Sequence, residues 1–155
     1  MTGEGIARRP PGRIGRWFMR APIWLYRLRM GWILGRRFVL VEHVGRTSGL
    51  VRRTVLEVVD HDPDGLAVAA AWGPRSDWYR NVEADPDVRL STCRMRDVPA
   101  RARVLAPPEA EEVFARYAEA HRRAASALSK VLDVPVADPI AMAGVVPVVR
   151  FDFSG

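Results

Sequence analysis

Residues 45–54, GRTSGLVRRT, combine the residue types that bind a phosphate group. Glycines near the start of this segment let successive backbone N–H groups turn towards an anion. Hydroxyl side chains add neutral donors, and each arginine can add a charge-assisted hydrogen bond of about 1.5–3 kcal/mol. The side chains concerned are Arg46, Thr47, Ser48, Arg52 and Arg53. The alternative is an ordinary hairpin loop whose arginines are only solvated.

This segment matches neither common nucleotide-binding pattern. It lacks the GxxxxGK[ST] of a P-loop and the GxGxxG of a dinucleotide fold. The sequence therefore predicts an anion site of another kind.

A second segment, residues 69–81 (AAAWGPRSDWYRN), has features suited to a flat ring. A run of alanines that ends at Gly73 lets a planar ligand lie close to the backbone. Trp78 and Tyr79 either wall such a ring or fill the core. Asn81 falls inside a predicted helix, which indicates a hydrogen bond to a ligand or to backbone.

The charge of the chain favours an anionic partner for its N-terminal third. Residues 1–53 hold twelve arginines against two acids, a net charge of +10, while the remainder carries −4 and the whole +6. A phosphate-bearing cofactor, a membrane surface or a nucleic acid would each suit this asymmetry. Nucleic-acid binding rests on the basic pI alone, because RNA- and DNA-binding motifs are missing, so no nucleic-acid partner is expected.

Metal binding and disulfides are not expected. Cys93 is the only cysteine, which fits a cytoplasmic protein. The three histidines, His43, His61 and His121, lack metal-ligand spacing.

The segments around these two sites are predicted to form strands. Hydrophobic and β-branched patterns predict strands at residues 38–44, 51–61, 66–72, 87–93, 96–104 and 145–153, with a turn at 62–65. Short connections between strands, with few helices, favour an antiparallel barrel with attached helices in a mainly β, α+β fold. We expect a flexible tail over residues 1–12 and one domain over 13–155.

Three helices are predicted. Ser76 caps a short helix over 76–84, and residues 107–132 form a long helix with acids early and bases late. Residues 13–37, rich in tryptophan and arginine, hold a helix from Pro22 to about Leu34. Arginines break each of its apolar runs, so it does not span a membrane. It either packs on the core or lies at the inner membrane surface as a peripheral contact.

Both segments together resemble the deazaflavin (coenzyme F420)-dependent nitroreductase family. HVGRTSGLVRRT is similar to its GR-x-SG-x-x-R stretch, and AAAWGPRSDWYRNVEADPDV is similar to its block around WY-x-N. VVPVVRFDF resembles its closing strand, so the resemblance covers roughly residues 22–153. It implies a split β-barrel of the flavin-reductase and pyridoxamine-phosphate-oxidase type.

The resemblance also implies a cofactor, coenzyme F420, an 8-hydroxy-5-deazaflavin with a phospholactyl-polyglutamate tail. By position, the phosphate and tail would contact Arg46, Thr47, Ser48, Gly49, Arg52, Arg53 and Thr54. The ring would lie on Ala70, Ala71, Trp72 and Gly73, beside Trp78, Tyr79 and Asn81. The family often has lysine where Thr47 stands, and Arg53 is the candidate to replace that charge. FMN is the alternative cofactor.

The expected activity is hydride transfer between the deazaflavin and a quinone, enone or nitro acceptor. Tyr117 and His121, one helical turn apart, are the candidate proton donors. The alternative is a non-catalytic deazaflavin- or flavin-binding protein, or a membrane-surface protein. Exposed barrel edges and the split-barrel relatives favour a homodimer.

Overall fold

The computed structural model of the chain describes residues 37–123 and 138–155. The predicted tail, the Trp/Arg-rich N-terminal helix and the end of the predicted long helix lie outside these residues. Six strands form in the described part: β1 (Phe38–Val44), β2 (Val51–Asp62), β3 (Gly65–Ala69), β4 (Asp87–Ser91), β5 (Val98–Val104) and β6 (Val148–Phe153). The helical elements are η2 (Gly73–Arg75), α2 (Asp77–Ala84), α3 (Pro107–Ala120) and α5 (Pro139–Val145).

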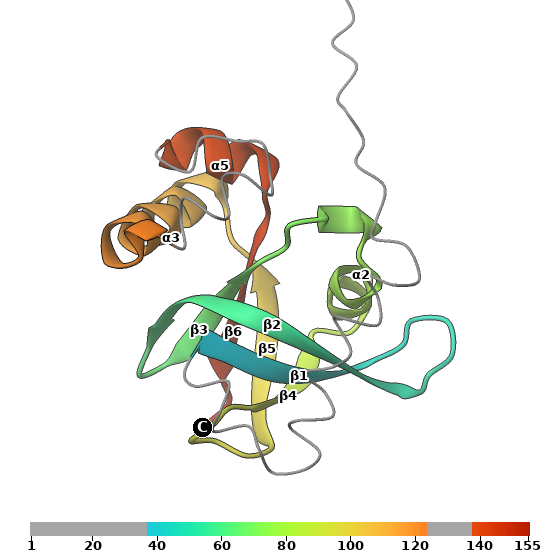
Figure 1. The fold of residues 1–155 in the computed structure, drawn as a ribbon. Helices are drawn as coiled ribbons and strands as arrows, with labels where there is room; N and C mark the ends of the chain where they lie inside the picture. The colour runs from blue at the N-terminus through green and yellow to red at the C-terminus, as the bar shows by residue number, and fades with distance from the viewer. Residues whose placement is uncertain (1–36, 124–137) are drawn as a thin grey trace, which may run out of the picture.

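The six strands close into an antiparallel barrel in the order β1-β2-β3-β6-β5-β4 (Figure 1). β1 and β2 form a long hairpin in which Phe38 lies opposite Glu57 and His43 opposite Arg52. The barrel confirms the predicted mainly β fold with helices. Because β4 also pairs with β1, the barrel is closed, and the expectation of exposed barrel edges was wrong.

The interior of the barrel is apolar. Alternate residues of β1 point inwards, so Val39 and Val41 are fully buried while their neighbours are half-buried. Leu90 of β4 and Phe151 of β6 meet them inside. The helix α2 closes one end of the barrel, where Tyr79 and Val82 join the interior core.

A second apolar cluster lies outside the barrel, beneath α3 and α5. Phe114 and Tyr117 of α3 and Met142 of α5 pack there with residues of β2, β3 and β6. Figure 1 shows α3 and α5 side by side, on the opposite side of the barrel from α2 and the tip of the β1–β2 hairpin.

Two helical predictions differ from the structure. The helix predicted over 107–132 leaves helical geometry at His121, whose φ and ψ are −135° and 55°. Neither proline nor glycine marks this break, and helix propensity alone therefore does not find it. The short helix α5 was not predicted, although Asp138 caps it through the N–H groups of Ile140 and Ala141 at 3.0 and 3.2 Å.

Four strands are shorter than predicted. β6 begins at Val148 and not at residue 145, because α5 extends to Val145. Local turns explain the ends of the other three. β3 stops at Ala69 because the N–H of Ala70 donates to the carbonyl oxygen of Pro147 and the chain turns at Gly73, with φ +48°. Between β4 and β5, the Thr92 hydroxyl accepts from the N–H of Met95, and Asp97 adopts a positive φ of 54°. Turns that use side-chain hydrogen bonds or a left-handed backbone compete with the hydrogen bonds between neighbouring strands.

We expect Gly65→Ala to destabilise the barrel. A Cβ at this position would clash with the backbone carbonyl oxygen of Phe151, which cannot move aside as the end of a flexible side chain could. The expected loss is roughly 1–3 kcal/mol of unfolding free energy, measured by urea denaturation. Gly144→Ala, in a helix with open space around it, is the control and should not destabilise. Equal stability of the two variants would contradict the packing described here.

Candidate functional site

The tip of the β1–β2 hairpin is a compact loop over residues 45–50. The N–H of Gly45 donates to the carbonyl oxygen of Leu50, and the N–H of Gly49 donates to that of Gly45, both at 2.8 Å. Gly49 has φ +66°, a left-handed conformation that favours glycine. At Gly45 a Cβ would lie 2.6 Å from Ser48 Oγ, so the glycine lets the Ser48 side chain fold over the loop.

Two backbone donors of this loop are left available. The N–H of Arg46 donates to Asn81 and that of Leu50 to Ser48 Oγ. The N–H groups of Thr47 and Ser48 have no acceptor within residues 37–123 and 138–155. Neighbouring free N–H groups at an exposed turn are suited to an anion, as the glycine and serine content predicted.

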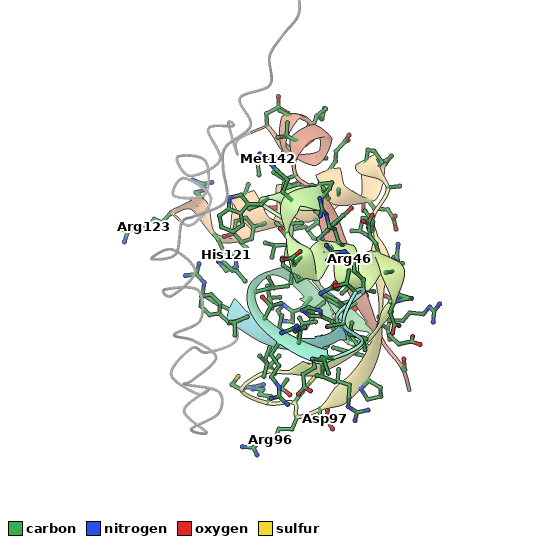
Figure 2. All side chains as sticks on the ribbon, turned by 90° about the vertical axis from the view of Figure 1, so that its right-hand side faces the viewer. Arg46, Arg96, Asp97, His121, Arg123 and Met142 are labelled. Carbon is green, nitrogen blue, oxygen red and sulfur yellow. The ribbon has the colours of Figure 1, made fainter. Side chains whose placement is uncertain are left out.

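The Arg46 side chain is largely committed to α2 (Figure 2). Its Nη1 donates to Asn81 Oδ1 at 3.0 Å, and Nη1 and Nη2 both donate to Asp77 Oδ1 at 3.3 and 3.2 Å. Three of the five guanidinium N–H groups are thus used, which leaves two for a ligand. Arg46 therefore ties the loop to α2.

Asn81 is the centre of this link, and its partner His43 is a residue that the sequence analysis did not select. Asn81 is 4% exposed, and its Oδ1 also accepts from the backbone N–H of Arg46 at 3.1 Å. Its Nδ2 lies 3.2 Å from His43 Nδ1. The prediction that Asn81 hydrogen-bonds to backbone is confirmed.

His43 is buried as a neutral ring. Burial and, to a smaller extent, the positive charge of Arg52 on the opposite strand together lower the pKa of His43 to about 4. The signal for this residue was present in the sequence: His43 follows Val39 and Val41 in the inward-facing series of β1. A polar side chain on a core-facing position needs a specific partner.

Arg52 and Arg53 point to opposite faces of the sheet, as adjacent strand residues must. Arg52 lies opposite His43 and makes one long contact, 3.5 Å, from Nη2 to Ser48 Oγ. Arg53 pairs with Glu42 at 3.2 Å on the outer face. The structure therefore brings Arg52 to the Ser48 side chain of the loop. Arg53 is paired with Glu42 instead, and Thr54 lies further along β2, opposite Val41.

The second predicted segment is divided between core and surface. Ala70 and Tyr79 are 1% and 5% exposed and belong to the barrel interior. Trp78 packs against this core, with its ring 5.9 Å from that of Tyr79 in an edge-on arrangement. Ala71 and Trp72 are half-buried. The residues available to touch a ring are thus Ala71, Trp72 and the exposed edge of Trp78.

The two candidate proton donors differ in exposure. Tyr117 is 2% exposed, and its hydroxyl donates to Glu57 Oε1 at 3.2 Å. Burial and the Glu57 carboxylate raise the pKa of Tyr117, so its proton is held firmly. His121 is exposed, and its ring lies 5.3 Å from that of Tyr117. Figure 2 shows His121 at the end of α3, away from Arg46.

These donors and the hairpin loop lie at different positions along β2: the loop precedes the strand, and Tyr117 contacts its middle. Arg52 is the second residue of the strand, and Glu57, which accepts a hydrogen bond from Tyr117, is five residues further on. At ~3.4 Å per residue this separation is ~17 Å. The odd spacing also places these two side chains on opposite faces of the sheet.

Comparison with protein families gives one match over most of the chain. The model of the F420H2-dependent quinone reductase family matches residues 17–137, a range that contains both segments. The chain belongs to the F420H2-dependent quinone reductase family. It is an F420-dependent oxidoreductase, as the paired segments predicted.

Solved structures agree with this family and with the fold. An F420-H2-dependent reductase is 25% identical over 76% of this chain and 95% of its own, with a TM-score of 0.53. A structure described as a domain-swapped dimer is 22% identical over 84% and 99%, with a TM-score of 0.52.

A third structure, named a putative pyridoxamine 5'-phosphate oxidase from Listeria innocua, is 8% identical over 87% and 94% of the chains, with a TM-score of 0.53. It supports the split-barrel fold that was predicted. A search of curated proteins gives no match. Among the described residues, no helix has the length and the hydropathy of a membrane-spanning segment.

We expect Asp77→Asn to strengthen cofactor binding. Asp77 is 85% exposed and places a negative charge beside the loop while it occupies Arg46. Its removal should raise the affinity for an anionic ligand about two- to fivefold, measured by fluorescence titration at low salt. Asp85→Asn, at the other end of α2, should change nothing. Weaker binding of Asp77→Asn would mean that the loop depends on this ion pair.

Proposed function

We propose that this protein reduces quinone-type acceptors with coenzyme F420 and anchors the phosphate of the cofactor on the β1–β2 hairpin loop. The observation that carries the proposal is one cluster of uncommitted donors. It consists of the N–H groups of Thr47 and Ser48, which have no acceptor among the described residues, and of the Arg52 guanidinium, which makes one long hydrogen bond among them, to Ser48 Oγ.

This donor set fits a phosphate. Backbone N–H groups and a guanidinium are the groups that bind phosphate oxygens, and Arg52 can do so through two parallel bonds. The hydroxyl of exposed Thr47 adds a neutral donor where other family members often carry lysine. Arg46 would contribute its two remaining N–H groups while it keeps its link to α2.

The ring of the cofactor would lie on the surface formed by Ala71, Trp72 and Trp78. When bound, the deazaflavin supplies the hydride chemistry. The protein binds and orients it, since positioning of the reactants is the main contribution of a protein to cofactor-dependent reactions. Ala70, Tyr79 and Asn81, which the sequence assigned to the ring, would support this surface from within.

The proposed proton donor is His121. Reduction of a quinone to a hydroquinone takes up one hydride and one proton, and the Tyr117 proton is directed to Glu57. We expect His121→Ala to lower kcat for quinone reduction about tenfold, whereas Tyr117→Phe lowers it less than about threefold. Steady-state rates at saturating cofactor, recorded from pH 5 to 8, measure both. The reverse order of effects would assign the proton to Tyr117.

Binding and turnover test the proposed function together. Purified protein is titrated with oxidised F420 and, separately, with FMN, and fluorescence is followed at two salt concentrations. We expect saturable, salt-sensitive binding of F420, weaker binding of FMN, and oxidation of reduced F420 when a quinone is added. Tighter binding of FMN would favour the alternative cofactor. F420 binding without turnover would indicate a carrier protein, and no binding would refute the proposal.

Two further expectations stay predictions: a homodimer, and contact of residues 13–37 with the membrane surface. Sedimentation of the full chain tests the first. Flotation with anionic liposomes, with and without residues 13–37, tests the second.

A further inference from the structure

Two polar side chains are buried in the described part of the chain, His43 and Asn81, and they contact each other. They lie where the end of the barrel meets α2, directly behind the hairpin loop. A buried polar pair of this kind is costly unless each member has a defined partner. Its position therefore calls for a role beyond packing.

We propose that His43 is a positioning residue for the cofactor: through Asn81, it holds the hairpin loop in the conformation that leaves the N–H groups of Thr47 and Ser48 available to the phosphate. This inference rests on the proposed function. It adds a residue that touches neither the ring nor the phosphate.

The hydrogen bonds fix the orientation of each group. Two donors of Arg46, its backbone N–H and its Nη1, point at one oxygen of Asn81, at 3.1 and 3.0 Å. The amide oxygen must therefore face Arg46, and the amide NH2 must face His43. The His43 Nδ1 atom then accepts a hydrogen bond, so the neutral ring carries its proton on Nε2.

The alternative arrangement would release the loop. If Nδ1 carried a proton, it would face the NH2 group of Asn81, donor against donor. Rotation of the amide would relieve this conflict, but it would then present NH2 to both donors of Arg46 and break both bonds. The acceptor state of His43 is thus the state that holds the Arg46 backbone in place.

The charges around His43 favour this neutral state. Arg52 lies directly opposite on β2, and its positive charge opposes a second positive charge on the ring. On α2, the carboxylate of Asp77 is paired with Arg46, which also donates to Asn81. The same guanidinium that would bind the phosphate therefore helps to keep the positioning residue uncharged.

Three variants test the proposal. His43→Phe fills the same space but cannot accept a hydrogen bond, and His43→Asn places Oδ1 where Nδ1 stood. Val41→Ala, two residues earlier on the same inward face, lowers stability without touching the link. The first readout is hydrogen exchange of the Arg46 amide in cofactor-free protein, and the second is the Kd for F420.

We expect His43→Phe to speed Arg46 exchange and to raise the Kd at least tenfold, with kcat at saturating cofactor within about twofold. His43→Asn should restore both to within about threefold of wild type, and Val41→Ala should leave the Kd unchanged. If folded His43→Phe shows the wild-type exchange rate of the Arg46 amide and the wild-type Kd, the inference is overturned and the proposed function stays intact. A wild-type protein that binds no F420 would overturn both.

A measurement on the unaltered protein covers the case in which His43→Phe does not fold. The 15N shifts of the His43 ring, recorded at pH 7, distinguish the two neutral tautomers. We expect an unprotonated Nδ1 and a protonated Nε2. A proton on Nδ1 would overturn the inference, whatever the variants do.

Discussion

Acidification from pH 7 to pH 4 should remove roughly 2–3 kcal/mol of unfolding free energy through one side chain, His43. The pKa of this residue is lowered to about 4 in the folded protein, against an ordinary value of 6.5. Between these two pKa values His43 is protonated in the unfolded chain but not in the folded protein, so stability falls as the pH falls. Below pH 4 both states are protonated, and the loss from this group is complete.

Urea denaturation at half-unit pH steps measures this loss. Carboxylates contribute in a lower range: the pKa of Asp62 is lowered from 3.8 to about 2 by its bond with Arg150, and that stability is lost only as the pH falls below about 4. The difference in unfolding free energy between wild type and His43→Phe at each pH gives the contribution of the histidine. The variant should lose the slope between pH 6.5 and 4, and an unchanged slope would refute the assignment.

Arg52→Ala should weaken F420 binding about 10- to 100-fold. A charge-assisted bond to phosphate contributes about 1.5–3 kcal/mol, and a tenfold change in Kd corresponds to 1.4 kcal/mol. Because Arg52 makes one hydrogen bond, at 3.5 Å, within residues 37–123 and 138–155, its removal should cost little stability. The salt dependence of binding should flatten, since one of the charges that attract the ligand is gone.

Two other arginine variants test whether the effect on the Kd is specific to Arg52. Arg101→Ala removes an exposed arginine paired with Asp87, remote from the hairpin, and should leave the Kd unchanged. Arg53→Ala breaks the pair with Glu42 on the outer face and should change the Kd less than threefold. If Arg53→Ala has the larger effect, the phosphate lies on the outer face of β2 instead.

The barrel was largely predictable because its signals are local. Alternation and β-branched residues gave β1 at its observed bounds and β2 within one residue. The turn predicted at 62–65 is present, with the N–H of Asp64 donating to Asp62 Oδ1 at 2.9 Å, although Gly65 does not adopt a positive φ. The helix α5 had a local signal too, an Asp138 cap followed by proline, which was overlooked.

The type of site, an anion site, was predictable from the sequence, but the role of each residue in it was not. Glycines, hydroxyls and arginines at 45–53 predicted an anion site, and composition alone treats its three arginines as equal. Their roles diverge through contacts with distant residues: Arg46 binds α2, thirty-five positions away, and Arg53 binds Glu42. The inward-facing position of His43 is visible in the sequence, but its role is not. That role depends on Asn81, which no spacing in the sequence places beside it.

The most direct test of the central claim is the response of two backbone amides to the cofactor. The 15N-labelled protein is titrated with F420, and the amide signals of Thr47 and Ser48 are followed beside the fluorescence signal. We predict that both amide protons shift downfield and saturate with the Kd given by fluorescence. F420 binding that leaves these two amides unmoved would contradict the anchor on the hairpin loop.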